Sequence, residues 1–322
     1  MTEPVVITWP GFLGSAGNEV LDEAGVAFRM EPRLGERAPG ELARVVAGAT
    51  AVIASTDPFT AEVFRACPSL RLVARVGVGY DAIDVAAATA AGVAVTTTPG
   101  TNASSVADHA LALMLAVLRR VAEHDAAIRK GAWPRGPAEV PGELTGRTVG
   151  LVGYGRVGRL VARRLAGFDA EVLTYDPLYD GGDVATPVPL PELLARSSVV
   201  SLHAPLLDAT RHLIGAAELR AMGPDAILIN TARGGLVDEP ALVAALAGGE
   251  IAAAGLDVFA EEPPPPARFR DLRNVVLTPH LAGLSDRSRA AMTRMACESV
   301  VDLLAGRMPR GILNPEALGD LG

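Results

Sequence analysis

Three residue types in the second half of the sequence could together bind an organic acid and move a proton. A histidine imidazole has an ordinary pKa near neutral, so it can take a proton from a hydroxyl group and return it in the reverse reaction, and His280 is the candidate for this role. Arg233 offers a planar fork of donors that matches a carboxylate and a carbonyl oxygen. Glu261 and Glu262 each supply a carboxylate that could orient the imidazole. This set suits the oxidation of a carbon that bears a hydroxyl group.

A glycine-rich segment has the pattern of a dinucleotide-binding loop, G-x-G-x-x-G. It comprises Gly153, Tyr154, Gly155, Arg156, Val157 and Gly158. The segment follows a predicted strand over 148–152 and opens a predicted helix over 156–167, which is the context that the motif requires. The first glycine would permit a tight turn, the second would let the backbone approach a pyrophosphate, and the third would allow close helix–strand packing. The helix N-terminus would then offer free N–H groups to the anion.

An acidic residue follows the next predicted strand, which covers 171–175 and ends at Tyr175. Asp176 lies at the distance typical of a carboxylate that accepts hydrogen bonds from the adenosine ribose hydroxyls and repels a 2′-phosphate. No Arg or Lys follows Asp176 immediately. The pattern therefore favours NAD over NADP.

These residues must be positioned by alternating strands and helices. A long helix should begin near Thr101 or Asn102, with Asn102 as its N-cap, and a last long helix should cover 286–305. Residues 131–142 are rich in Gly and Pro and indicate a connecting arm. Apolar runs predict strands over 5–9, 51–54, 72–76, 93–97, 148–152, 171–175, 198–202, 226–230, 253–258 and 275–277. Strands that alternate with helices predict an α/β fold with a parallel, doubly wound sheet.

Several separate segments match one known family in the same order along nearly the whole chain. They are Arg75–Asp81, Thr98–Asn102, Val106–His109, the glycine motif, Leu202–Pro205, Asn230–Gly235, Leu256–Pro263 and Thr278–His280. On these segments the sequence resembles the D-isomer-specific 2-hydroxyacid dehydrogenase family. The resemblance implies an NAD-dependent oxidoreductase that moves a hydride between the cofactor and a D-2-hydroxy acid or its 2-keto acid.

The resemblance also implies a role for each matched residue. The catalytic set is Arg233, Glu262 and His280, since the family pattern places the acid directly before a proline. The substrate contacts implied are the backbone of Val76, Gly77, Val78 and Gly79, together with Asn102 and Arg233. The cofactor contacts implied are Gly153, Tyr154, Gly155, Arg156, Val157, Gly158, Tyr175, Asp176, His203, Ala204, Pro205, Thr210, Thr231, Ala232, Asp257, His280 and Gly283. No metal site is implied.

Two domains are expected from the length and from the family. A Rossmann-type nucleotide domain over 101–287 should be inserted into a flavodoxin-like α/β substrate domain made of 1–100 and 288–322. The two chain crossings would act as hinges for a closure that excludes water. By resemblance we expect a homodimer, with the long helix and the arm around Trp133 in the interface.

Composition narrows the remaining function classes. The chain has 322 residues and a net charge of −8, which argues against a broad nucleic-acid-binding surface. Cys67 and Cys297 lie far apart, so they indicate free thiols rather than a metal site or a disulfide framework. The N-terminus lacks a basic patch followed by an apolar run, and no apolar stretch is long enough to cross a bilayer. These features predict a cytoplasmic protein that contacts neither a membrane nor nucleic acid.

Other activities of the same scaffold stay open at this point. Formate dehydrogenases of the family carry Gln where Glu262 stands, which disfavours formate oxidation, whereas phosphite oxidation uses a similar catalytic set. A protein of a different class, an NAD(H)-sensing binding protein like the corepressors built on this fold, would bind NADH but reduce keto acids poorly.

The sequence also leaves the substrate open among 3-phosphoglycerate, hydroxypyruvate, glyoxylate and larger 2-keto acids. Segments such as 58–63 and 75–79 look closest to phosphoglycerate dehydrogenases, although no C-terminal regulatory domain is expected. A phosphorylated substrate should need extra cationic groups, for which Arg75 and Arg135 are candidates.

Overall fold

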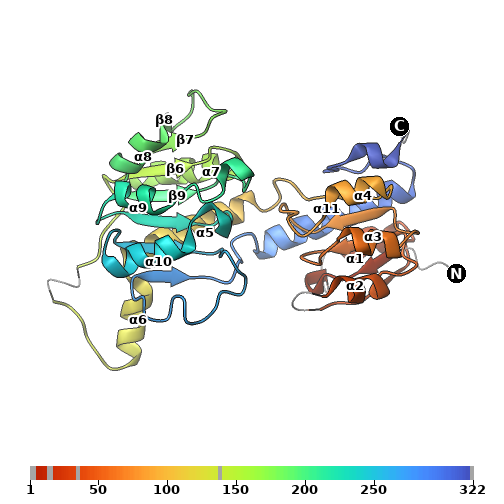
Figure 1. The fold of residues 1–322 in the computed structure, drawn as a ribbon, viewed down its shortest axis with the longest axis horizontal. Coiled ribbons are helices and arrows are strands. Elements are labelled where there is room, and N and C mark those ends of the chain that lie inside the picture. Colours follow the sequence, from red (N-terminus) through yellow and green to blue (C-terminus); the bar gives the residue numbers. More distant parts are fainter. Residues whose placement is uncertain (1–4, 13–16, 34–36, 137–139, 320–322) are drawn as a thin grey trace. The chain divides into compact units, whose positions relative to one another are not determined.

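The computed structural model describes residues 5–12, 17–33, 37–136 and 140–319 (Figure 1). The chain divides into two compact units. The first unit combines the residues up to Asn102 with those from Leu284 onward, and the second unit is the continuous segment Ala103–Gly283. The sequence-based boundaries lay a few residues away, near 100 and 288. Each unit has its own sheet and its own buried core.

The described residues of the first unit contain a sheet of five parallel strands in the order β2-β1-β3-β4-β5. This is the flavodoxin-like order. The strands are β1 (Val5–Ile7), β2 (Phe28–Met30), β3 (Ala51–Ala54), β4 (Leu72–Arg75) and β5 (Ala94–Thr96). Apart from the half-buried Arg75 that ends β4, those in the middle are continuous runs of buried Val, Ile, Leu and Ala, as expected for strands covered on both faces.

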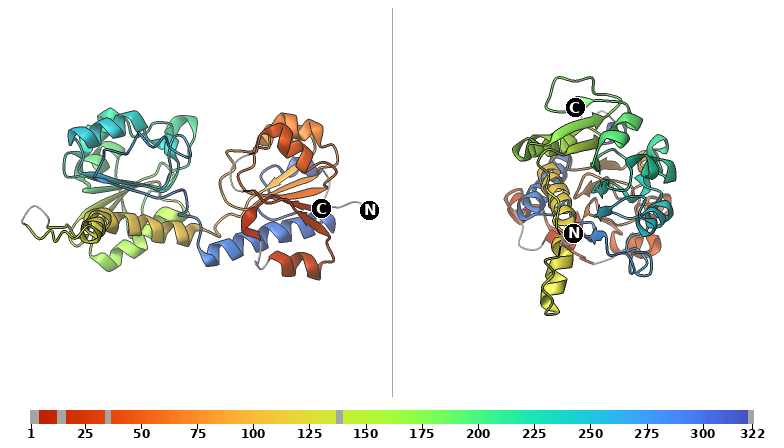
Figure 2. Two further views of the ribbon diagram at one scale, coloured as in Figure 1. Left: turned by 90° about the horizontal axis from the view of Figure 1, so that it is seen from below. Right: turned by 90° about the vertical axis from the view of Figure 1, so that its left-hand side faces the viewer.

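Helices cover both faces of this sheet (Figure 2). One face packs against α1 (Gly17–Glu23) and α11 (Asp286–Leu304), and the other packs against α2 (Pro39–Val45), α3 (Ala61–Ala66) and α4 (Val85–Ala90). Short 3₁₀ turns lie at Pro10–Phe12 (η1) and Pro315–Leu318 (η6). Helix α11 is capped by Ser285, whose hydroxyl accepts a hydrogen bond from the Ser288 N–H. The C-terminal segment is therefore part of the first unit's core.

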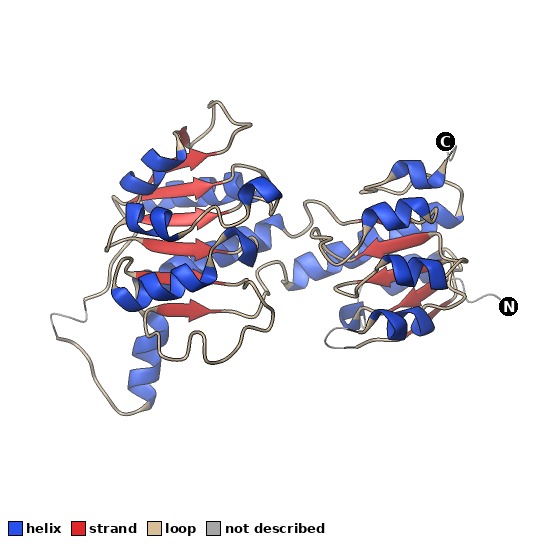
Figure 3. Ribbon diagram, in the orientation of Figure 1, coloured by secondary structure: helices blue, strands red, loops and turns tan. Residues whose placement is uncertain are grey.

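The described residues of the second unit form a seven-stranded parallel sheet in the order β12-β11-β10-β9-β6-β7-β8 (Figure 3). The strands are β6 (Thr148–Val152), β7 (Glu171–Tyr175), β8 (Thr186–Pro187), β9 (Val199–Leu202), β10 (Ile227–Asn230), β11 (Ala253–Leu256) and β12 (Val275–Leu277). The chain order reverses between β6 and β9. In doubly wound sheets such a switch point is where dinucleotides bind.

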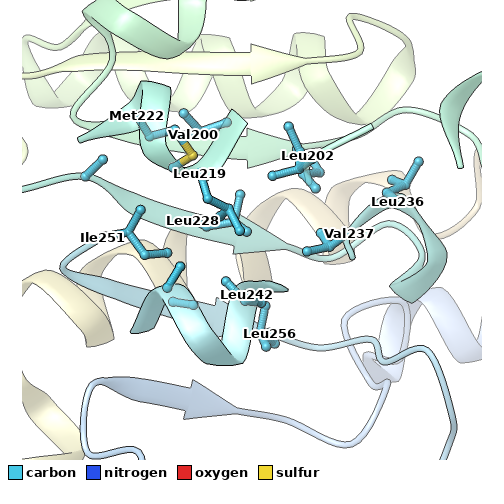
Figure 4. Packing of buried hydrophobic residues seen from close by; sticks show 14 of the residues in the cluster. Val200, Leu202, Leu219, Met222, Leu228, Leu236, Val237, Leu242, Ile251 and Leu256 are labelled. Carbon is cyan, nitrogen blue, oxygen red and sulfur yellow. The ribbon is translucent and has the colours of Figure 1, made fainter. Parts of the chain in front are cut away.

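Two helical layers enclose the second sheet. One layer holds α5 (Ala103–Leu118) and α7 (Arg156–Leu165), the latter continued by the 3₁₀ turn η3 (Ala166–Phe168). The other layer holds α8 (Leu190–Arg196), α9 (Ala216–Met222) and α10 (Glu239–Gly248). Leu219 and Met222 of α9 and Leu242 of α10 pack onto β9, β10 and β11 (Figure 4). Further short turns are η4 (Asp208–Thr210) and η5 (Gly234–Leu236). The sheet is thus held rigidly from both sides.

Strands β2 and β8 and helix α6 are among the elements that were not predicted from the sequence. Strand β2 is a three-residue edge strand of half-buried residues, and β8 has two exposed residues, of which Pro187 cannot donate a ladder hydrogen bond. Helix α6 (Val121–Arg129) has no buried residue, so its sequence lacks the apolar stripe that identifies an amphipathic helix. Within the described residues, no helix is both long and apolar enough to cross a membrane.

Candidate active site

The three predicted catalytic side chains follow three neighbouring strands of the second unit. Arg233 follows β10, Glu262 follows β11 and His280 follows β12. Because these strands are parallel and adjacent, their carboxyl ends meet at one edge of the sheet. That edge is where doubly wound sheets bind ligands.

His280 and Glu262 form a short hydrogen bond. His280 Nδ1 lies 2.6 Å from Glu262 Oε2, and Glu262 Oε1 accepts the N–H of Phe259 at 3.1 Å. The two side chains are 49% and 36% exposed, so solvent or a ligand can reach them. Because the carboxylate occupies Nδ1, proton exchange with a bound molecule falls to Nε2. The carboxylate thus selects both the ring orientation and the reactive nitrogen.

The charge on Glu262 is maintained by its surroundings. Burial alone would raise the pKa of this carboxyl group, but the hydrogen bond and charge of His280, the Phe259 N–H and the charge of Arg233 together lower the pKa below its ordinary value of 4.5. Glu262 is therefore ionised at neutral pH. Its negative charge stabilises the positive charge that the imidazole carries after it takes up a proton.

The Arg233 loop is shaped by a buried asparagine at the end of β10. Asn230 donates from Nδ2 to the Arg233 carbonyl at 2.9 Å and accepts the Ala232 N–H at 3.0 Å. The Arg233 guanidinium donates to the Ala232 carbonyl at 2.7 Å. Gly234 lies so close to the backbone of Phe259 and Ala260 that a Cβ atom there would overlap it. The loop of Arg233 therefore packs directly on the loop that carries Glu262.

The His280 loop is shaped by a fully buried carboxylate at the end of β11. Asp257 accepts hydrogen bonds from the Thr278 hydroxyl at 2.6 Å, the Leu281 N–H at 3.0 Å and the Ala282 N–H at 2.8 Å. The Asp257 carbonyl accepts the His280 N–H at 2.8 Å. His280 itself has a φ of 50°, in the left-handed region that few non-glycine residues adopt. The structure thus shows Asp257 fixing the loop that presents the imidazole.

The glycine motif lies where the strand order reverses. Gly153 has a φ of 97°, and a Cβ atom there would lie 2.6 Å from the Ala204 nitrogen in the loop after β9. A Cβ atom on Gly158 would overlap the Gly153 carbonyl, whereas one on Gly155 would meet no protein atom within 4 Å. The Tyr154 N–H donates to Asp176 Oδ2 at 2.7 Å. Gly155 therefore faces open space, whereas Gly153 and Gly158 are packed against backbone atoms.

These observations fit a dinucleotide at the switch point. The open space beside Gly155 lies at the N-terminus of α7, whose first N–H groups suit a pyrophosphate. At the end of β10, the buried Thr231 hydroxyl has no hydrogen-bond partner among the described residues. A buried hydroxyl without a partner costs free energy unless a ligand satisfies it. A cofactor that runs from Gly155 past Thr231 would do so.

Several other predicted cofactor contacts lie on the loop that follows β9. His203 Nε2 lies 3.0 Å from the Ser201 hydroxyl, and burial lowers the pKa of His203 to about 4, so this ring is neutral at pH 7. Ala204 and Pro205 follow on that loop, where the Thr210 hydroxyl donates to the Pro205 carbonyl at 2.7 Å. The remaining predicted contacts also belong to the second unit, namely Arg156, Val157, Tyr175, Ala232 and Gly283.

The predicted substrate-binding residues other than Arg233 belong to the first unit. Val76, Gly77, Val78 and Gly79 form the loop after β4. The Gly77 N–H donates to the Thr98 hydroxyl at 3.0 Å, and the Gly77 carbonyl accepts the Thr98 N–H at 2.9 Å. The Arg75 guanidinium donates to the Val76 carbonyl, so a cationic group stands at this loop. Asn102 is the last residue of the N-terminal part of the first unit and directly precedes α5.

Sequence reasoning missed the residues that hold these loops together. Asn230 is 1% exposed, and Glu239, 5% exposed, accepts the Ala260 N–H at 2.9 Å and an Arg268 N–H. A polar residue at the last position of an apolar strand could have identified Asn230. Glu239 had no such signal, because its partners lie in a distant loop and one of them is a backbone group.

Comparisons with known proteins agree with this geometry. A family model described as "D-isomer specific 2-hydroxyacid dehydrogenase, NAD binding domain" matches residues 111–282. The chain is 46% identical over 271 residues to a glyoxylate reductase of Korarchaeum cryptofilum, with 82% of each protein covered. It is 42% identical over 277 residues to a D-3-phosphoglycerate dehydrogenase of Mycobacterium tuberculosis, covering 85% of this chain and 52% of that protein. The crystal structure of the TT0316 protein of Thermus thermophilus superposes with a TM-score of 0.90 at 38% identity, covering 96% and 99% of the two chains.

Proposed function

The chain belongs to the D-isomer specific 2-hydroxyacid dehydrogenase family and is an NAD-linked oxidoreductase of hydroxy and keto acids, and on that premise we propose that it reduces small 2-keto acids such as glyoxylate and hydroxypyruvate. The observation that carries the proposal is the hydrogen-bonded pair of His280 and Glu262 beside the Arg233 loop. This arrangement supplies a proton at one edge of the sheet together with a cationic anchor for an acid.

Each of the three side chains has a distinct task in the proposed reaction. Arg233 binds the substrate carboxylate and polarises the carbonyl oxygen. His280 in its protonated form donates the Nε2 proton to that oxygen as the ketone becomes an alcohol, and it takes the proton back in oxidation. Glu262 orients the ring and stabilises its positive charge. The nicotinamide cofactor supplies the hydride when it is bound.

Residues of the first unit are proposed to complete substrate binding. The backbone amides of Val76, Gly77, Val78 and Gly79 would hold the substrate carboxylate, and Asn102 would line the same site. The glycines of this loop permit a close approach of backbone to ligand. Gly77 supports the proposal with a φ of 140°, which side chains other than glycine rarely adopt.

One residue supports a second candidate substrate. The similarity of this chain to a glyoxylate reductase supports a small acid, whereas Arg75 at the Val76–Gly79 loop supports the phosphorylated keto acid that corresponds to 3-phosphoglycerate. A phosphate would need such a cation. Loss of activity on the phosphorylated acid in Arg75→Ala, with glyoxylate turnover retained, would assign the enzyme to the second candidate.

The first experiment measures NADH oxidation with a panel of 2-keto acids. His280→Asn should lower kcat by about 10²–10⁴-fold, the range for a lost general acid. His212→Asn is the matched control, since His212 is also exposed and has a φ of 51° against 50° for His280, and Asn tolerates this conformation. Arg233→Ala should raise KM and lower kcat, whereas Arg220→Ala, which alters an exposed residue of α9, should change neither. Full activity of His280→Asn would refute the assignment, and tight NADH binding without turnover of any acid would favour a sensor.

We further propose that the chain forms a homodimer through α6 and the arm that follows it. Trp133 is 75% exposed and Val140 74% exposed, and with Ile128 and other residues they line a hollow of about 420 Å³. Large exposed apolar side chains gathered in one place are typical of an interface. Sedimentation analysis should give a dimer for the wild type and for Leu178→Ser, which alters a side chain that is 95% exposed, but a monomer for Trp133→Ser. A monomeric wild type would rule out this interface.

A further inference from the structure

Helix α5 contacts the His280 loop at two points. The Ser105 hydroxyl donates to the Ala282 carbonyl at 2.7 Å, and His109 Nε2 lies 2.9 Å from the Thr278 hydroxyl oxygen. Ser105 and His109 are four residues apart and therefore lie on the same face of the helix. Ala282 lies two residues after His280, and Thr278 lies two residues before it. The loop that presents the imidazole is thus held by α5 on both sides.

The direction of the His109 hydrogen bond follows from its neighbours. The Thr278 hydroxyl has one proton, and it donates that proton to Asp257 Oδ1 at 2.6 Å. The hydroxyl can therefore only accept from His109, so Nε2 of His109 carries the proton. His109 Nε2 also lies 3.5 Å from Asp257 Oδ1, which suits a donor and not a lone pair. His109 is a hydrogen-bond donor that completes a buried chain from α5 through Thr278 to Asp257.

The helix is a rigid support for these two contacts. The opposite side of α5 contributes Ala107, Ala110, Leu111 and Met114 to the core that it forms with α7 and the sheet. The His109 side chain is 18% exposed and the Asp257 side chain is 0% exposed, so water competes little for the hydrogen bonds. Hydrogen bonds shielded from water are stronger and better defined than those at a surface.

His280 depends on such a support because it has little packing of its own. Its side chain is 49% exposed and its backbone adopts the left-handed conformation. Strained backbone of this kind persists only where the surrounding structure holds it in place. A displacement of about 1 Å at a reacting group can cost on the order of 100-fold in rate.

We propose that Ser105 and His109 are positioning residues that set the imidazole of His280 for proton transfer. The inference rests on the proposed role of His280 as the proton donor. Neither residue touches the substrate or the cofactor in this proposal. They act through Ala282 and Thr278 on the loop between them.

The experiment compares variants that remove each contact with matched variants that keep it. His109→Leu removes the donor, whereas His109→Gln places an amide N–H near the position of Nε2. Ser105→Ala removes the second contact. Ser104→Ala is its control, because the neighbouring Ser104 hydroxyl accepts a hydrogen bond from Arg164 at 2.8 Å and does not contact the His280 loop.

Two readouts separate positioning from a general loss of structure. Steady-state kinetics should show kcat for keto-acid reduction lowered about tenfold or more in His109→Leu and Ser105→Ala, with KM nearly unchanged. Proton NMR of the five histidines should show the His280 Nδ1–H of the short bond to Glu262 as a downfield resonance in the wild type. That resonance should shift or broaden in the same two variants and be retained in His109→Gln and Ser104→Ala.

The proposal is overturned if both contact-removing variants keep the wild-type kcat, or if kcat falls while the His280 resonance is unchanged. Where His109→Leu fails to fold, as judged by its melting temperature, Ser105→Ala alone decides between these outcomes. Failure of the proposed function gives a different result, namely a fully active His280→Asn or a wild type that reduces no keto acid. The NMR comparison then still tests whether α5 positions the imidazole.

Discussion

Glu262 is the residue whose charge the surrounding groups control most directly. Four features favour its ionised form, namely the hydrogen bond and the charge of His280, the Phe259 N–H and the positive charge of Arg233. Glu261, next to it, has a 66% exposed side chain and lies 3.8 Å from Arg268 instead. Of these two adjacent carboxylates, Glu262 contacts the imidazole and Glu261 lies near a guanidinium group instead.

The lowered pKa of Glu262 predicts how activity depends on pH. A carboxyl group whose pKa is lowered in the folded protein keeps its charge down to its ordinary value of 4.5 and loses it only as the pH falls through the lowered value. Glu262→Gln should reduce the rate of keto-acid reduction by about tenfold or more at neutral pH. In the wild type, carbon NMR of the Glu262 carboxyl group should show it ionised from about pH 7 to about pH 5 and taking up its proton only at lower pH.

Glu261→Gln is the control for this measurement and should follow the wild-type pH profile. A Glu262 carboxyl signal that already titrates between about pH 7 and about pH 6 would mean that Glu262 takes up its proton there. That result would contradict the lowered pKa and the short bond to His280.

At the scale of single residues, the sequence predicted the candidate catalytic side chains better than it predicted the hydrogen bonds that hold their loops. The motifs around Arg233, Glu262 and His280 predicted which side chains carry the chemistry, and their catalytic roles stay predictions until the variants are measured. Asn230 and Glu239 were not predicted as site residues, because each forms hydrogen bonds with backbone groups of a loop. Such contacts depend on loop conformations. A polar residue at the end of an apolar strand could have indicated Asn230, whereas no residue pattern indicated Glu239.

Among the elements, the turn between β6 and α7 is the one most constrained by its glycines. Gly153 and Gly158 pack against backbone atoms, whereas the position of Gly155 is open. The same motif thus serves two purposes. Its outer glycines allow the chain to fold, and its middle glycine leaves room for a ligand.

This difference predicts opposite outcomes for two alanine substitutions. Gly155→Ala should leave the melting temperature unchanged and weaken NADH binding by at least about tenfold, because the methyl group projects where the pyrophosphate would lie. Gly158→Ala should lower the melting temperature by several degrees, since overpacking costs roughly 1–3 kcal/mol. Thermal melts and NADH fluorescence titrations of both variants check the prediction. An unstable Gly155→Ala, or unchanged NADH affinity, would contradict it.

The element predictions succeeded where burial imposes a pattern. The largely buried strands over 51–54, 148–152 and 171–175 have the predicted bounds. The edge strand over 275–277 is not buried, but its apolar run also predicted its bounds. Helix α6 and strands β2 and β8 lack a buried apolar face, and no local pattern distinguishes such elements from loops. The predicted parallel, doubly wound architecture and the family resemblance are confirmed.

At the scale of the whole molecule, the chain consists of two units with separate cores. The second unit is continuous in sequence and contains the glycine motif, Asp176, Thr231 and all three proposed catalytic residues. The first unit is assembled from both ends of the chain and contains the Val76–Gly79 loop. Neither core borrows strands from the other unit.

This division predicts that a fragment of residues 103–283 folds and binds NADH on its own. Its sheet is covered on both faces by its own helices, so its core needs nothing from the first unit. The fragment should bind NADH with an affinity within about tenfold of the whole chain. It should not reduce keto acids, because it lacks the loop proposed to hold the substrate. Circular dichroism and NADH titration check the first claim, and measurable turnover by the fragment would contradict the second.

The proposed catalytic residues and the proposed substrate loop are far apart in the sequence, and this has a consequence for evolution. Arg233, Glu262 and His280 are encoded in one short stretch of the gene, while the loop proposed to recognise the acid is encoded far upstream. Recombination or drift in the outer segments is therefore expected to change which acid is recognised and to leave the proton donor intact. A lineage that carries this gene can then diversify its substrates without reinventing the reaction.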